Sequence, residues 1–151
     1  EVSPWSLSWD DENYYLIAYD SSEKIIKHFR VDKMLHIQSN GRHREGEQEF
    51  KSFDMAAYAR KVFGMYAGKE ETVRIECDNS LAGVVIDRFG KDVTMIPIDD
   101  KHFYVSVDVA VSRQFLAWVI GLGEGVKLVS PDNVVALMNE EIDRLIRQYR
   151  K

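Results

Sequence analysis

The chain has 151 residues, of which 45% are hydrophobic and 11% aromatic, and its formal net charge is −5 at neutral pH. This length and composition are sufficient for a packed core in one ordinary domain or two small ones, and they exclude a disordered chain as the default. There is no apolar run of about 18 residues, and the N-terminus Glu1-Val2-Ser3-Pro4 does not have the residue order of a signal peptide. We therefore expect a cytoplasmic protein without a membrane span.

The first third of the chain has the alternation and turns of a β-meander. Residues 5–9 alternate apolar and small polar side chains, and the polar residues 10–13 predict a turn before a second strand at 14–20. A third strand is predicted at 25–31, and we expect residues 34–37 to continue the sheet. A polar loop should follow, at residues 39–48, before a helix that Asp54 caps. The helix carries Met55, Tyr58, Val62 and Tyr66 at helical spacing and ends at Gly64 and Gly68.

The second half of the chain predicts strands and helices in the order β-α-β-β-α-β. The expected elements are a strand at 73–77, a helix at 79–89, strands at 93–98 and 103–109 around a turn at Asp99-Asp100, a helix capped by Ser112, and a strand at 126–129. This order is typical of a ferredoxin-like sandwich. A last helix begins at Ser130-Pro131, with the serine as N-cap and the proline at the first helical position. Its apolar residues are spaced 3, 4, 3 and 4 apart, which predicts a narrow seam for packing on a partner helix or on the sheet: Val135, Met138, Ile142, Leu145 and Tyr149.

A basic window interrupts this acidic chain between Lys24 and Arg44. Asp32 is the one acidic residue in the window. The basic residues are Lys24, Lys27, Arg30, Lys33, Arg42 and Arg44. Such a local reversal of charge indicates an anionic partner.

Two interpretations of the basic strand remain open. In one, it is a solvated edge strand that lysines protect from aggregation. In the other, Tyr14 or Tyr15 lies beside Arg30 and Lys27 across the hairpin, which places aromatic rings for base stacking next to donors for phosphate. His28 and Arg30 point away from Lys27 on a strand, so the charges do not share one surface. The second interpretation predicts binding of single-stranded nucleic acid or a nucleotide.

Catalytic and metal-binding motifs are missing from the sequence. Gly121-x-Gly123-x-Gly125 follows a predicted helix rather than a strand, so it does not match a phosphate-binding loop. His28, His36 and His43 are 8 and 7 residues apart, which matches no compact ligand spacing, and Cys77 is the only cysteine. We predict no catalytic residue, no metal site and no cofactor, and therefore a protein that is not an enzyme.

Two groups of segments carry a family resemblance. The first group is Val2–Trp5, Tyr14–Asp20 and Phe29–Met34, and the second is Phe63–Gly68, Val73–Cys77, Asp87–Gly90 and the helix after Ser130-Pro131. Together they resemble the WYL domain, with Tyr14 where the naming tryptophan stands, and the C-terminal extension that accompanies it in bacterial transcriptional regulators. The resemblance implies an α+β chain: a partial Sm-like or SH3-like β-barrel at 1–50, a helical connector at 51–71, and a ferredoxin-like βαββαβ extension at 72–151 with a C-terminal helix. In such regulators a winged helix-turn-helix precedes these domains; this chain lacks it and is expected to start after the first barrel strand.

The positions that match the WYL domain imply which residues would face a ligand. They are Tyr15, Lys27, Arg30 and Lys33, with His28 next in line. Tyr15 would stack on a base or position a phosphate, Arg30 would bind the phosphate, and the lysines would add charge attraction.

These patterns together predict a sensor. We expect the effector-sensing and dimerisation part of a bacterial transcriptional regulator, which forms a homodimer and binds single-stranded nucleic acid or a nucleotide to control a DNA-binding domain. The alternative is a protein–protein interaction and oligomerisation module without a nucleic-acid ligand.

Overall fold

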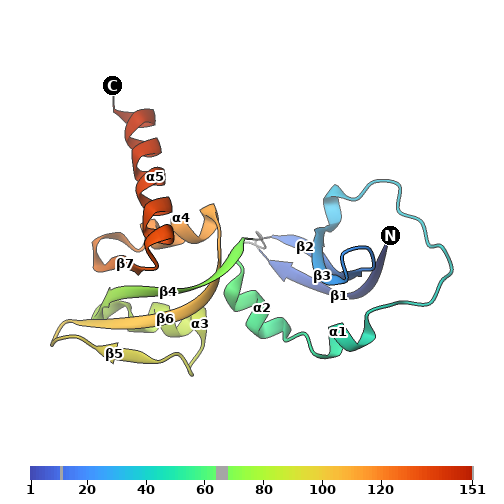
Figure 1. The fold of residues 1–151 in the computed structure, drawn as a ribbon, viewed down its shortest axis with the longest axis horizontal. Helices are drawn as coiled ribbons and strands as arrows, with labels where there is room; N and C mark the ends of the chain where they lie inside the picture. The colour runs from blue at the N-terminus through green and yellow to red at the C-terminus, as the bar shows by residue number, and fades with distance from the viewer. Residues whose placement is uncertain (11, 64–67, 151) are drawn as a thin grey trace. The chain divides into compact units, whose positions relative to one another are not determined.

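The structure, a computed structural model, divides the chain into two compact units. It describes residues 1–10, 12–63 and 68–150, and the units are Glu1–Tyr58 and Ala59–Lys151 (Figure 1). Within these described residues, unit 1 holds a three-stranded antiparallel sheet and unit 2 a four-stranded one. The predicted mixed α+β class is confirmed.

Three strands in the order β1-β2-β3 form the sheet of unit 1. They are β1 (Val2–Asp10), β2 (Asn13–Asp20) and β3 (Ile25–Arg30). The predicted meander is confirmed over these strands, and a shift of register between Pro4 and Ser6 marks a bulge in β1. Because side chains alternate along a strand, Tyr15, Ile17 and Tyr19 share one face of β2, and all three are buried.

The expected continuation of the sheet at Met34–Ile37 is wrong. The chain turns instead through a 3-10 helix, η1 (Val31–Lys33), which the amide of Met34 closes by donating to the carbonyl of Val31 at 3.1 Å. Leu35 and Ile37 are then 81% and 73% exposed. Their alternation resembled a strand, but the turn carries the chain away from the edge of β3, where it would have had to pair.

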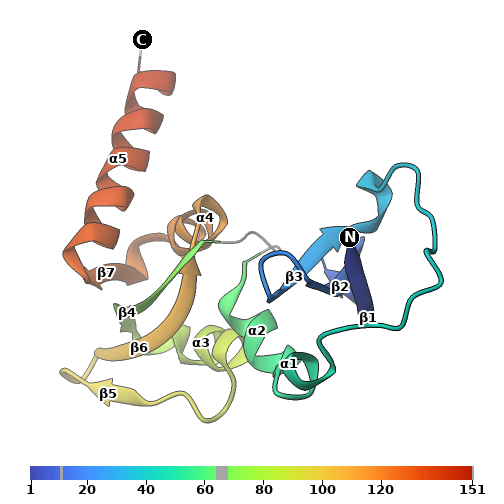
Figure 2. The same cartoon turned by 45° about the vertical axis from the view of Figure 1, so that its right-hand side comes forward.

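Residues 45–58, which we call the covering segment, lie against the buried face of this sheet. The segment follows the long loop seen in Figures 1 and 2 and includes α1 (Glu47–Lys51) and the start of α2 (Met55–Lys61). Trp5 stacks on Phe50 at a centroid distance of 5.4 Å, and its Nε1 donates to the carbonyl of Glu45 at 2.8 Å. The amide of Glu45 in turn donates to Ser3 Oγ at 2.9 Å. These contacts attach the segment to β1.

Unit 2 has the predicted β-α-β-β-α-β order, followed by the last helix. Its elements are β4 (Lys69–Asp78), η2 (Asn79–Leu81), α3 (Ala82–Phe89), β5 (Met95–Pro97), β6 (His102–Val111), α4 (Arg113–Gly121), η3 (Gly123–Gly125), β7 (Val126–Ser130) and α5 (Asp132–Tyr149). The strands lie in the order β5-β6-β4-β7, each antiparallel to its neighbours. One face of β4 and β6 is buried together with Phe115 of α4, Val85 of α3 and Val134 of α5. Burial raises the pKa of the Cys77 thiol in β4 to about 11.

Two of the three predicted helix N-caps are confirmed and the third is wrong. Ser112 accepts a hydrogen bond from the amide of Phe115 at 3.2 Å, and Asp54 Oδ1 accepts one from Ala57 at 2.9 Å, which confirms both caps. Ser130 is not the N-cap of the last helix, because it pairs with Arg74 at the end of β7 and Pro131 occupies the cap position. Gly64, expected at the end of the helix, and Tyr66, expected among its apolar residues, lie outside the described residues.

Two glycines, Gly46 in the covering segment and Gly41 in the loop before it, distinguish the cost of backbone strain from the cost of a packing collision. Gly46 and Gly41 have φ angles of 79° and 72°, in the left-handed region that disfavours side chains. A Cβ at Gly46 would also collide with the ring of Tyr19, whereas one at Gly41 would meet no atom within 4 Å. We expect Gly41→Ala to cost about 1 kcal/mol of unfolding free energy and Gly46→Ala about 2–4 kcal/mol, measured by urea denaturation. Equal losses would mean that the segment does not pack on Tyr19.

Candidate ligand-binding face

Strand pairing decides which of the predicted ligand residues share a face. Tyr15 in β2 lies directly opposite Arg30 in β3, and His28 lies opposite Ile17. Opposite residues of an antiparallel pair project to the same side, so Tyr15, His28 and Arg30 share the face that the covering segment overlies. The predicted position of Tyr15 beside Arg30 is confirmed, whereas the predicted position beside Lys27 is wrong, because Lys27 lies opposite Ala18.

Aromatic side chains fill the space over Tyr15 and His28. Tyr15 is only 7% exposed, and its ring meets that of His28 edge-on at a centroid distance of 6.0 Å. The hydroxyl of Tyr58 and Nδ1 of His28 share a hydrogen bond. Phe53 packs against Tyr58 at a centroid distance of 4.9 Å. In this structure, therefore, Tyr58 covers one side of His28.

Arg30 lies at the rim of this face and is held by an acidic neighbour. Its Nε and Nη2 donate to the two carboxylate oxygens of Asp32 at 2.8 and 3.2 Å. This bidentate pair holds the pKa of Asp32 below its ordinary value. The Arg30 side chain remains 38% exposed, and Lys33 follows on the exposed turn of η1. An anion that binds Arg30 has to compete with Asp32.

Lys27 projects to the opposite face of the sheet. It lies opposite Ala18, and its Nζ is 2.7 Å from Asp20 Oδ2 and 2.6 Å from Glu23 Oε1. These partners raise the pKa of Lys27, with Asp20 the larger influence. The sequence pattern had already placed Lys27 and Arg30 on different faces, and the strand register agrees.

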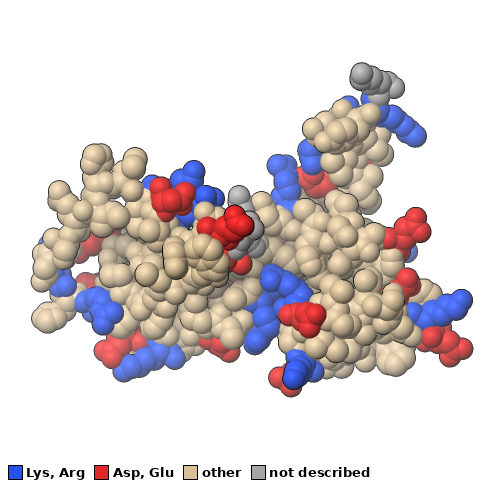
Figure 3. Space-filling model, turned by 180° about the vertical axis from the view of Figure 1, so that it is seen from behind, with Lys and Arg blue, Asp and Glu red and all other residues tan. Residues whose placement is uncertain are grey.

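Ion pairs compensate much of the basic window. Lys27 pairs with Asp20 and Glu23, and Arg42 lies 3.5 Å from Glu1; all three acidic partners lie outside the window along the chain. Figure 3 shows Lys and Arg side chains interspersed with Asp and Glu over the face in view. A count of charges along the sequence therefore overstates the positive charge of the basic window.

Sequence reasoning missed an apolar surface on the other face of the same sheet. Leu7, Trp9 and Tyr14 are 62%, 59% and 55% exposed, and the rings of Trp9 and Tyr14 meet edge-on at 4.7 Å. Leu7 pairs with Leu16, which lies opposite Phe29, so apolar side chains extend across the three strands. The alternation of Leu7 and Trp9 with serines was the available signal, although it does not say which face is covered.

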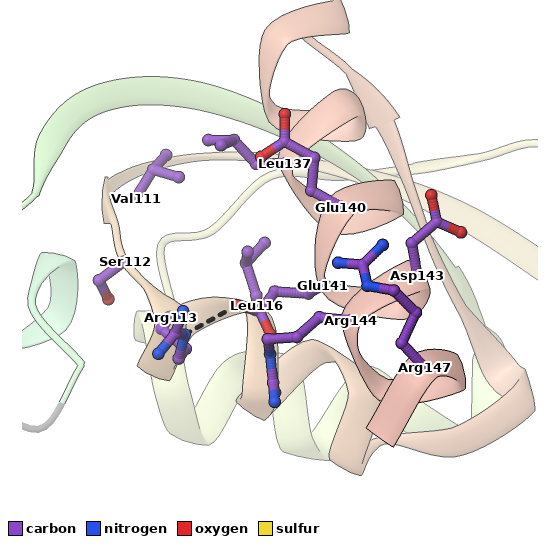
Figure 4. A pocket seen from close by; sticks show the side chains of 10 residues that line it. All are labelled: Val111, Ser112, Arg113, Leu116, Leu137, Glu140, Glu141, Asp143, Arg144 and Arg147. Carbon is purple, nitrogen blue, oxygen red and sulfur yellow. Dashed lines mark hydrogen bonds and ion pairs between the residues drawn. The ribbon is translucent and has the colours of Figure 1, made fainter. Parts of the chain in front are cut away.

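Unit 2 contains a groove between the start of α4 and the middle of α5. Figure 4 shows Arg113 reaching Glu141, whose carboxylate accepts from Arg113 Nε at 2.7 Å and from Arg144 Nε at 2.6 Å. These two arginines hold the pKa of Glu141 below its ordinary value, with Arg144 the larger influence. Basic and acidic side chains line the groove in equal number: Arg113, Arg144 and Arg147 with Glu140, Glu141 and Asp143. The groove therefore has no charge bias towards an anion.

The described residues 1–10, 12–63 and 68–150 contain no group of three or more His, Cys, Asp or Glu side chains that could hold a metal ion. No helix in the described part of the chain combines the length and the apolar character needed to cross a bilayer.

Comparisons with known proteins cover both units. The WCX domain model matches residues 69–146, just over half of the chain, and the WYL domain model matches residues 1–39. Among solved structures, the proteasome accessory factor B/C (PafBC) of Arthrobacter aurescens is similar at 19% identity with a TM-score of 0.47, a score too low to establish a shared fold. The chain spans 22% of the length of that protein, which in turn aligns over 99% of this chain. No curated protein matches.

Asp20 gives unit 1 an acid-sensitive turn. Lys27 and Ser22 donate to its carboxylate and hold its pKa well below the ordinary value. Asp20 therefore stabilises the fold fully above the ordinary carboxyl pKa, and this contribution is lost as the pH falls towards the folded-state pKa. We expect Asp20→Asn to lower the melting temperature at neutral pH, with the difference from the parent chain shrinking in acid.

Two lysine variants are controls for this pH dependence. Lys27→Met removes the main partner of Asp20 and should reproduce much of the effect, whereas Lys24→Met, at an exposed position of the same turn, should not. A constant difference in melting temperature between Asp20→Asn and the parent chain at all pH values would contradict the role of the Asp20 charge.

Proposed function

Because this chain belongs to the WCX-domain family and its N-terminal residues match the WYL domain, we propose that it is the effector-sensing part of a bacterial transcriptional regulator. In this proposal it is not an enzyme and uses no cofactor or metal. It controls a DNA-binding domain that lies outside residues 1–151 and works in the cytoplasm.

We assign each unit to a fold on the basis of its strand order. The order β5-β6-β4-β7 with antiparallel neighbours, built from β-α-β-β-α-β, supports a ferredoxin-like assignment for unit 2. The antiparallel β1-β2-β3 meander supports its assignment to part of an Sm-like or SH3-like barrel. The division into barrel (1–50), connector (51–71) and extension (72–151) stays a prediction.

The proposed ligand is single-stranded nucleic acid or a nucleotide, bound at the face of Tyr15, His28 and Arg30. The observation that carries this proposal is the register that sets an aromatic ring directly opposite a guanidinium, with an imidazole on the same face. Aromatic rings bind bases by stacking, and a guanidinium binds phosphate through paired hydrogen bonds. Lys33, on the exposed turn of η1, adds electrostatic attraction for the phosphate at short range. Lys27, on the opposite face, contributes only at longer range.

Substitutions at the two ends of one ion pair test this proposal. Arg30→Ala should weaken binding of a short fluorescein-labelled single-stranded DNA by about 1–3 kcal/mol and reduce the salt slope by about one ion. Asp32→Asn should strengthen binding, because it removes the acidic competitor for Arg30. Fluorescence anisotropy at several salt concentrations measures both.

A lysine of unit 2 serves as the matched control. Lys127 is exposed and lies in β7, so Lys127→Ala removes one positive charge far along the chain from Arg30. Equal losses for Arg30→Ala and Lys127→Ala would indicate non-specific attraction. Absence of binding by the parent chain at low salt would contradict the proposal for single-stranded DNA.

A second candidate function, self-association, is favoured by an exposed apolar stripe on α5, which includes Ile142 and Tyr149 of the predicted seam together with Ile146. Val135 and Met138 pack against the core of unit 2, whereas Ile142 and Ile146 are 42% and 43% exposed and Tyr149 is 74% exposed. The half of the helix that carries these three residues extends away from the sheet in Figures 1 and 2. An exposed apolar stripe on a helix is a common site of protein contact.

The charges on α5 favour a second copy of the chain as its partner. Glu140 and Asp143 precede Arg147 and Arg150, so the helix changes from acidic to basic along its length. In an antiparallel pair, the basic end of each helix would face the acidic middle of the other. We therefore propose a homodimer through α5, with or without a nucleic-acid ligand.

Charged residues in the stripe should disrupt this dimer. Ile142→Glu combined with Ile146→Glu should shift the chain to a monomer in sedimentation equilibrium, because burying a carboxylate in an apolar contact is unfavourable. Ile120 in α4 has the same 43% exposure as Ile146, so Ile120→Glu is a control that should leave the dimer intact. A parent chain that stays monomeric at high concentration would contradict the proposal.

A further inference from the structure

We infer that the outer part of the covering segment, Phe53–Tyr58, is an internal occupant of the ligand face, and that the base of a nucleotide binds by taking the place of the Tyr58 ring. This inference rests on the proposed nucleotide or single-stranded ligand. It adds a regulatory step, because the face is closed by the chain itself until the segment is displaced.

The contacts of Tyr58 are the ones that a base would make. Its ring lies 5.8 Å from that of His28, its hydroxyl shares a hydrogen bond with His28 Nδ1, and His28 in turn meets Tyr15 edge-on. A nucleobase also offers a flat ring with polar atoms on its edge, so it can replace both the ring contact and the hydrogen bond. The attached phosphate would then lie towards Arg30, at the exposed rim of the same face.

The covering segment is attached unevenly, which allows one part of it to move. Its inner part is held by the stack of Trp5 on Phe50, by the hydrogen bond from Trp5 to Glu45 and by the close approach of Gly46 to Tyr19. The outer part contributes the rings of Phe53 and Tyr58, both only partly buried, and no residue of α2 is fully buried. Regions that bury few apolar atoms open at the lowest free-energy cost.

Closure of the face lowers the apparent affinity for any ligand that needs it open. The measured dissociation constant equals the intrinsic one divided by the fraction of molecules in which the face is open. The hydrogen bond and the ring contacts of Tyr58 hold the face closed, so removal of this side chain should strengthen binding roughly threefold to tenfold.

The experiment compares the 151-residue chain with Tyr58→Ala and Tyr58→Phe in two assays. The first assay is binding of a short fluorescein-labelled oligothymidine, measured by fluorescence anisotropy. The second needs no ligand: the rate at which diethylpyrocarbonate modifies His28, measured by mass spectrometry relative to the exposed His36. We expect Tyr58→Ala to raise the His28 rate and to bind the oligothymidine roughly threefold to tenfold more tightly. Tyr58→Phe, which keeps the ring, should show smaller changes in the same direction.

Tyr14→Ala is the matched control. Tyr14 lies in the same strand on the opposite, exposed face, so its loss should change neither the His28 rate nor the affinity by a comparable factor. Circular dichroism checks that each variant is folded, and if Tyr58→Ala is not, the milder Tyr58→Phe variant decides the result.

The outcomes separate the inference from the function on which it rests. A faster His28 reaction with unchanged or weaker binding by Tyr58→Ala, while the parent chain binds, overturns the inference and leaves the ligand proposal standing. An unchanged His28 rate overturns the inference as well, because Tyr58 then does not close the face. A faster His28 reaction with no binding by any variant rules out the nucleotide ligand, and the inference with it.

Discussion

The structure of unit 1 depends on how a three-stranded sheet buries one of its faces. Antiparallel sheets of this size commonly pack one face on a core and leave the other in solvent. The chain supplies this cover from its own residues 45–58, which are attached through the stack of Trp5 on Phe50 and the approach of Gly46 to Tyr19. The same cover encloses Tyr15 and places Tyr58 against His28. One segment therefore sets the stability of unit 1 and, in the proposed function, also access to the ligand face.

In unit 2, helices cover the buried face of the sheet, and the last helix extends beyond this core. Helices α3 and α4 and the first half of α5 pack on one face of its four strands, with Phe115 and Val134 completely buried. The second half of α5 continues beyond this core with Ile142 and Ile146 partly exposed. One helix thus serves two purposes along its length, since its first half completes a core and its second half presents a surface.

Local patterns were sufficient to predict most elements and two of the caps. Alternation located β1 to β3, and Ser112 was recognisable as a cap because its hydroxyl acts within one helical turn. The errors concern partners distant along the chain. Whether Met34–Ile37 forms a strand depends on whether a neighbour is available, and Ser130 belongs to β7 because Arg74 pairs with it. The burial of Tyr15 had no local signal either, because the covering residues come some forty positions later.

The pairing of β7 with β4 has a consequence for the order in which the chain folds. The residues of unit 1 in this chain end at Tyr58, whereas the sheet of unit 2 closes only when Leu128 reaches Ile75. During synthesis, the edge of β4 that pairs with β7 stays unpaired until β7 emerges from the ribosome. Because pairing between distant residues slows folding, unit 1 should acquire its structure first and unit 2 later, as a single late step.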